Sequence, residues 1–126
     1  AVNRAFHVYG ENRRVREEVQ ALRSGDFQRF LTLVQESGRS SAMYLQNIIP
    51  TGSTAAQELM VTIALCERML EGRGAVRVHG GGFGGTAQAF VPLDMLDRFR
   101  DRVEASLGRG CCHVVRIRPA GGIRLG

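Results

Sequence analysis

Five glycines in six residues, Gly80-Gly81-Gly82-Phe83-Gly84-Gly85, lie between two stretches in which apolar and polar side chains alternate. Such alternation predicts strands at 75–79 and 86–91. Because glycine permits positive φ angles and close backbone approach, the run is suited to connecting the two strands. We therefore expect an antiparallel hairpin with a glycine-rich tip, which restricts the chain to folds that contain a β-sheet.

The sequence before the hairpin has the apolar spacing of helices. A first helix is predicted over about 11–23 from Val15, Val19 and Leu22, and apolar residues extend it upstream past a weak point at Gly10. After Ser24-Gly25-Asp26, a second helix is predicted from Phe27 to about Gly38. Residues 39–53 are irregular. A third helix then carries Ala55, Leu59, Ile63, Cys66 and Leu70 on one face, with Thr54 and Gln57 spaced as a capping box and Gly72 as its end.

The sequence after the hairpin predicts one more helix and one more strand. The helix covers 93–107, with Met95, Phe99 and Val103 on one face and Asp94 and Arg98 spaced for an ion pair. Gly108 ends it. Residues 112–118 alternate like a strand, with His113, Val115 and Ile117 on one face, and a glycine-rich tail follows.

This element order, α-α-α-β-β-α-β, predicts an α+β fold in two layers, with helices covering one face of a sheet. It is similar to the ferredoxin-like β-α-β-β-α-β pattern with its first strand missing. We expect one domain over 1–126, helical over 1–72, with strands, glycine loop, helix and last strand over 73–119 and a tail over 120–126. The chain does not begin with Met, so Ala1 is a processed terminus or a boundary within a longer protein.

The composition narrows the function. All 17 basic residues are Arg, and the net charge is +5. The absence of Lys excludes a phosphate-binding P-loop lysine and Schiff-base chemistry. The arginines alternate with acidic residues, which is typical of solvated helix faces, so we expect no nucleic-acid partner. No apolar run approaches the ~18 residues of a membrane span, so we expect no membrane partner. Cys66, Cys111 and Cys112 include no C-x-x-C, which favours a reducing, cytoplasmic location and no metal site.

The glycine loop is the strongest chemical signal. Gly80, Gly82 and Gly85 satisfy G-x-G-x-x-G, but a strand follows instead of the helix that a dinucleotide site requires. Successive main-chain N–H groups in such a loop can form an anion-binding nest. A flexible hairpin tip is the alternative. Candidate residues that support a phosphate site are Gly80, Gly81, Gly82, Phe83, Gly84, Gly85 and Thr86, flanked by Arg77 and His79. Phe83 is a candidate anchor for the loop, and His79 is better explained as a packed strand-end residue than as part of a phosphate site.

Two blocks of sequence carry a family resemblance. Residues 74–86, GAVRVHGGGFGGT, resemble the third motif of the GHMP kinases in its galactokinase form, G-x-R-M-T-G-[GA]-G-F-G-G-C. Residues 4–15 and 21–26 are similar to the galactokinase patterns R-x-x-H-V-x-x-E-N-x-R-V and A-L-x-x-G-D. The chain departs from these patterns at His79 and Thr86, and in 41–54 only Tyr44 and Pro50 have counterparts.

The resemblance implies the C-terminal part of a galactokinase-like sugar kinase, which transfers a phosphoryl group from Mg-ATP to galactose. It implies that the sugar-recognition motif, the nucleotide loop and the catalytic residues belong to an N-terminal domain of the same polypeptide. We therefore expect no catalytic residue in this chain, no activity of the chain alone, and no tightly bound cofactor. A missing strand would leave an exposed surface through which the chain dimerises. The alternative function is a stand-alone ferredoxin-like regulatory module that binds an anion or metabolite.

Overall fold

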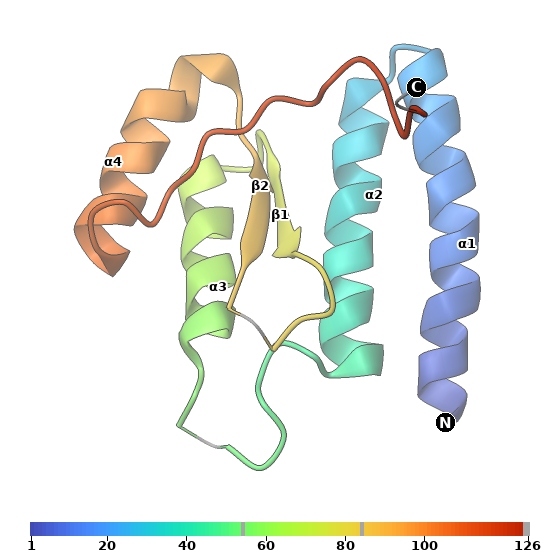
Figure 1. The fold of residues 1–126 in the computed structure, drawn as a ribbon, viewed down its shortest axis with the longest axis horizontal. Helices are drawn as coiled ribbons and strands as arrows, with labels where there is room; N and C mark the ends of the chain where they lie inside the picture. The colour runs from blue at the N-terminus through green and yellow to red at the C-terminus, as the bar shows by residue number, and fades with distance from the viewer. Residues whose placement is uncertain (54, 84, 125–126) are drawn as a thin grey trace.

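The computed structural model describes residues 1–53, 55–83 and 85–124. Within them the fold is α+β, with four α-helices and one two-stranded sheet (Figure 1). The elements are, in order, α1 (Val2–Arg23), α2 (Phe27–Ser40), α3 (Glu58–Leu70), β1 (Ala75–Val78), β2 (Ala87–Phe90) and α4 (Leu96–Leu107). A π-helical turn, Ser41–Leu45, continues α2, and a 3-10 turn, Leu93–Met95, leads into α4.

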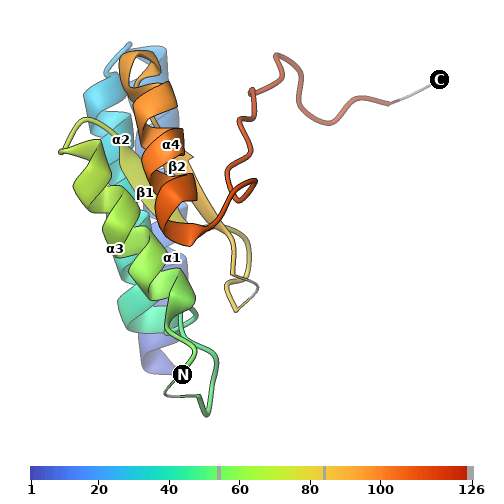
Figure 2. The same cartoon turned by 90° about the vertical axis from the view of Figure 1, so that its left-hand side faces the viewer.

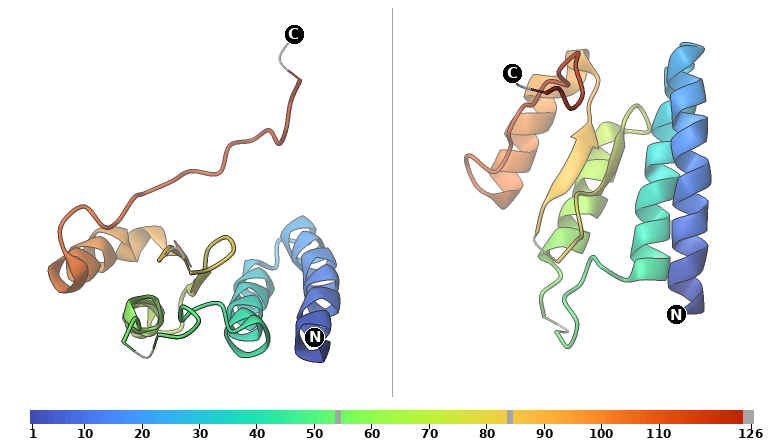
Figure 3. Two further views of the ribbon diagram at one scale, coloured as in Figure 1. Left: turned by 60° about the horizontal axis from the view of Figure 1, so that its bottom comes forward. Right: turned by 45° about the vertical axis from the view of Figure 1, so that its right-hand side comes forward.

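Helices α1 and α2 form the predicted helical hairpin and lie side by side (Figures 1 and 3). The turn between them is set locally, because Gly25 takes a φ of 73° and the Asp26 carboxylate accepts a hydrogen bond from the Arg29 N–H at 2.9 Å. This is the usual arrangement of an N-cap. α1 begins at Val2 and continues through Gly10, so the helix is longer than the predicted 11–23.

The face of α1 that meets α2 is mainly polar. His7, Arg14 and Ala21 are its buried residues, spaced seven apart. His7 Nδ1 lies 2.9 Å from the Ser40 hydroxyl oxygen, within hydrogen-bonding distance. The apolar residues that predicted the helix, including Val15 and Val19, are exposed. Apart from Ala21, the packing of α1 therefore uses polar side chains.

The predicted antiparallel hairpin is confirmed. β1 pairs with β2 in the register Ala75↔Phe90 through Val78↔Ala87. The His79 N–H donates to the Thr86 carbonyl at 2.9 Å and extends the pairing toward the tip. α2 and α3 both pack against β1, and α3 also meets β2 (Figure 3).

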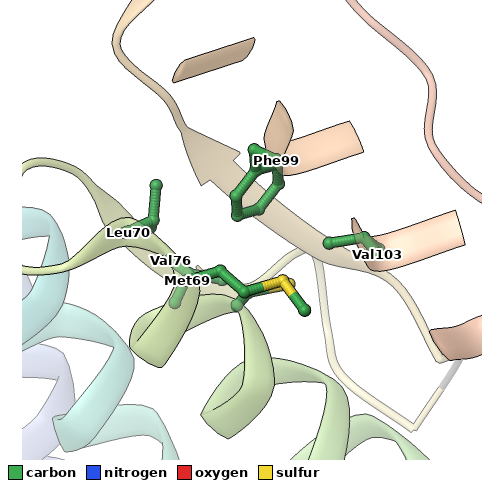
Figure 4. Packing of buried hydrophobic residues seen from close by; sticks show 6 residues of the cluster. Met69, Leu70, Val76, Phe99 and Val103 are labelled. Carbon is green, nitrogen blue, oxygen red and sulfur yellow. The ribbon is translucent and has the colours of Figure 1, made fainter. Parts of the chain in front are cut away.

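The core is built where the helices meet this sheet. One cluster joins α3, β1 and α4 through Cys66, Met69, Leu70, Val76, Phe99 and Val103 (Figure 4). A second joins α2 to the hairpin through Leu31, Val34 and Ala75, and a third joins Ile48, Leu59 and Val78. The apolar faces predicted for α3 and α4 are thus largely the ones that are buried.

The predicted ion pair between Asp94 and Arg98 is wrong. The Asp94 carboxylate accepts two hydrogen bonds from Arg73, at 2.8 and 3.0 Å, and Arg98 bonds Glu71 at 3.3 Å. Asp94 lies in the 3-10 turn and not in α4, so the i, i+4 geometry of an α-helix does not apply to it. The two pairs link the start of α4 to the turn between α3 and β1.

The predicted last strand over 112–118 is also wrong. Residues 111–124 have no regular secondary structure and run along and away from the body of the protein (Figure 2). A strand requires a hydrogen-bonded neighbour, and this segment pairs with neither β1 nor β2. Only Cys112 is half-buried, against the cluster around Phe99. The alternating pattern of residues 112–118 therefore does not lead to strand pairing in this structure.

The proposed capping box at Thr54 lies outside the described residues.

Among the residues that are described, no helix is long and apolar enough to cross a bilayer.

Candidate functional site

The described part of the glycine loop, 79–83 and 85–86, has an unusual backbone. Gly80, Gly82, Phe83 and Gly85 all have positive φ angles, of 68°, 78°, 56° and 75°. Glycine adopts this conformation without steric cost, and a non-glycine residue such as Phe83 adopts it only when its surroundings favour it. Gly84, the remaining member of the predicted loop, lies outside the described residues.

Asn47 fixes the conformation of the glycine loop through two hydrogen bonds. Its side-chain Nδ2 donates to the Gly81 carbonyl at 3.2 Å, and its own carbonyl accepts from the Phe83 N–H at 3.0 Å. These two bonds lie on either side of Gly82. A Cβ at Gly82 would lie 2.2 Å from the Asn47 carbonyl oxygen, so only glycine fits there. The backbones of Gly82 and Asn47 are therefore in direct contact.

Asn47 is itself fixed by its neighbours in the sequence. Gln46 ends the π-helical turn in the left-handed conformation, at a φ of 55°, and turns the chain toward the loop. Ile48 is buried between Leu59 and Val78. Asn47 is consequently only 4% exposed. Sequence reasoning missed this residue because it lies in the irregular stretch 39–53, where no periodicity marks a position.

The two hydrogen bonds with Asn47, which together clamp the loop, leave other polar groups of the loop without protein partners. In the described part of the chain, the N–H groups of Gly80, Gly81, Gly82 and Gly85 donate to no protein acceptor. The buried Asn47 Oδ1 also has no hydrogen-bond partner there. Unpaired main-chain N–H groups in alternating backbone conformations are the donors of an anion-binding nest. These main-chain N–H groups are therefore available to an acceptor from outside the described part of the chain.

The remaining side chains of the predicted loop take no part in holding it. Phe83 is 52% exposed, so its backbone, and not its ring, anchors the loop. Thr86 contributes its carbonyl, and its side chain is exposed. His79 is exposed as well, so it is not the packed strand-end residue of the alternative reading.

Arg77 points toward the helices. Its Nη1 donates to the Ser37 hydroxyl at 2.5 Å, and that hydroxyl donates to Glu11 Oε2 at 2.5 Å. Its Nε donates to the Val78 carbonyl at 3.1 Å. Gly38 permits this approach, because a Cβ there would lie 2.9 Å from the Arg77 Cβ. Arg77 is thus part of a network joining β1, α2 and α1.

Glu11 is the acidic centre of that network. Partial burial tends to raise its pKa, but the hydrogen bonds from Ser37 and Arg14 outweigh burial and lower the pKa below its usual value. Arg14 Nε donates to Glu11 Oε1 at 2.6 Å. Glu18, which is also on α1, has a raised pKa because it is partly buried and lies near the charge of Glu11.

The three cysteines are free: Cys66 is buried, Cys111 is exposed and Cys112 is half-buried. Burial, together with the neighbouring Cys111, raises the pKa of Cys112 to about 11. Within the described residues, no group of three or more His, Cys, Asp or Glu side chains is placed to hold a metal ion.

Comparison with known proteins shows a similarity to a galactokinase. The chain is 34% identical over 100 residues to a galactokinase of Glaesserella parasuis, and the match covers 79% of this chain. It covers 24% of that protein, so the chain spans about a quarter of the length of the relative. No family model matches the chain, and no solved structure matches it.

Proposed function

We propose that this chain is the C-terminal part of a galactokinase-like sugar kinase and that its glycine loop contributes to the phosphate site. Two observations support the proposal: the similarity to a galactokinase over 100 residues, and the clamped loop with four unpaired N–H groups in its described part. In the whole enzyme the loop would bind phosphate oxygens of Mg-ATP. The reaction would transfer the γ-phosphoryl group to galactose.

The chain's contribution in this proposal is positioning. Phosphoryl transfer is accelerated mainly by fixed geometry and by stabilising charge, and backbone N–H groups supply both. Asn47 and Gly82 would hold those donors still before ATP arrives. The groups that act on the sugar hydroxyl would come from the N-terminal part of the enzyme, so the isolated chain is expected to be inactive.

The two strands would belong to a larger ferredoxin-like sheet in that enzyme. The antiparallel hairpin, packed against helices and followed directly by α4, is consistent with this arrangement. In the same proposal, the rest of the polypeptide supplies the missing partner of this domain.

A chimera tests the proposal. This chain would replace the matching segment of the Glaesserella parasuis galactokinase, and galactose-dependent ADP formation would be measured. We expect activity, and we expect Gly82→Ala in the chimera to reduce it more than Gly81→Ala does, because a Cβ at Gly81 meets nothing within 4 Å. A chimera that unfolds cooperatively but phosphorylates no sugar would contradict the proposal.

The stand-alone regulatory module remains the second candidate, because the same N–H groups would serve it. Titrating the isolated chain with galactose 1-phosphate, and following the amide NMR signals of Gly80–Gly82, separates the two. Tight saturable binding by the chain alone would favour the module. Weak or absent binding agrees with the kinase.

A further inference from the structure

One face of α1 carries an apolar stripe that nothing in the described protein covers. Its members are Val8, Val15, Val19 and Leu22, which are 52%, 54%, 41% and 51% exposed. Four exposed apolar side chains in a line on one helix are unusual for a surface that remains in water. Figure 3 shows α1 at the outer edge of the molecule, with α2 on its inner side.

The stripe has the heptad spacing of a coiled coil. With Val8, Val15 and Leu22 as d positions, the a positions are Ala5, Asn12 and Val19, and all six residues are exposed. The helix is 22 residues long, which accommodates about three heptads. The buried residues His7, Arg14 and Ala21 are all c positions, so α2 occupies a different face and leaves the seam free.

Asn12 at an a position favours a defined two-stranded pairing. An asparagine there lowers the stability of a coiled coil but selects its register and its number of strands, because only a paired asparagine opposite it satisfies the amide. This residue indicates a partner helix with the same pattern.

The charges beside the seam indicate which partner that is. The g positions include Glu11 and Glu18, and the e positions include Arg16 and Arg23. In a parallel pair each g residue faces the e residue of the next heptad on the other helix. Two copies of α1 would therefore place Glu11 opposite Arg16 and Glu18 opposite Arg23, twice over by symmetry.

Glu11 already bonds Arg14 and Ser37, but the other three charges that this pairing would use are free in the described part of the chain. Arg16, Glu18 and Arg23 form no ion pair within the described residues, whereas Arg13 and Arg14 on the same helix do. An antiparallel pair would bring g against g and e against e, placing Glu11 near Glu11 and Arg16 near Arg16. The repulsion disfavours that orientation.

We infer that two copies of this chain dimerise through a parallel coiled coil of their α1 helices. The pairing would bury the stripe, match Asn12 with Asn12 and form two Glu18–Arg23 ion pairs, one on each side of the seam. α1 is already a packed helix against α2, so little ordering is needed on association. The inference is drawn from the structure of α1 and goes beyond the proposed kinase function.

Analytical ultracentrifugation of the chain tests this inference. We expect a concentration-dependent dimer, and we expect V15E with V19E to weaken it by about a hundredfold, because two buried apolar contacts become charged. Phe6→Glu is the matched control: Phe6 is 64% exposed on the same helix but lies at a b position, so dimerisation should persist. A chain that remains monomeric at about 0.5 mM would overturn the inference and leave the stripe to a different protein.

Charge variants test the orientation. Glu18→Arg alone and Arg23→Glu alone should each weaken the dimer, because like charges then face each other. Mixing the two single variants should restore a dimer that contains one copy of each, and the double variant should restore it as well. Dimers that these variants do not change, or single variants that do not recover on mixing, would contradict the parallel pairing. Far-UV circular dichroism checks that each variant remains helical.

Discussion

At the scale of single residues, the contact between Asn47 and Gly82 decides the shape of the glycine loop. A glycine-rich tip is costly to order, because glycine has more backbone freedom to lose than any other residue. One hydrogen bond that Asn47 donates and one that it accepts offset part of that cost and hold the backbone of the tip in place. The sequence predicted the loop but not its clamp, since the two lie 34 residues apart.

Gly82→Ala should destabilise the protein by about 1–3 kcal/mol, because alanine is strained at a φ of 78° and its Cβ would overlap the Asn47 carbonyl. Urea unfolding measures the change. Gly81→Ala is the control, since its added Cβ meets nothing. Equal stability of the two variants would show that the close contact with Asn47 does not constrain the loop.

At the scale of elements, the local sequence determined where the helices form, but it predicted the buried face for only some of them. For α4, the face of Phe99 and Val103 is both the predicted and the buried one, because helix and core coincide there. For α1 the two differ: the apolar side chains point outward, and the contact with α2 runs through Ser37, Glu11 and Arg77. Apolar periodicity identifies a helix, but it does not identify the segment that packs against that helix.

Ser37→Ala should lower the free energy of unfolding by about 1–3 kcal/mol. The side chain is almost fully buried, and its loss removes a hydrogen bond from Glu11 and an acceptor from Arg77. Thermal or urea unfolding provides the measurement. Ser106→Ala is the comparison, because Ser106 is exposed and donates only to the Arg102 carbonyl in the same helix. If both substitutions had the same small effect, the network would not stabilise the packing of α1.

At the scale of the whole molecule, residues 111–124 lie outside the packed body. Trypsin should therefore cleave after Arg116 well before it cleaves within α4 at Arg100 or Arg102, and mass spectrometry will identify the products. The trimmed protein should unfold within about 0.5 kcal/mol of the intact one, because exposed residues contribute little to stability. Protection of Arg116 would mean that the segment packs against the rest of the protein, as the predicted strand required.

The sequence alone determined the features that depend on neighbours along the chain. Apolar periodicity gave the helices, alternation gave the hairpin, and the glycine run gave its tip and the resemblance to galactokinases. Tertiary structure decided whatever depends on distant partners: the burial of Asn47 beneath the loop, the pairing of Asp94 with Arg73, the exposed seam of α1, and the absence of a strand at 112–118. The physical reason is the same in each case. A local pattern fixes what a segment can form, whereas hydrogen-bond partners and burial exist only once remote segments meet.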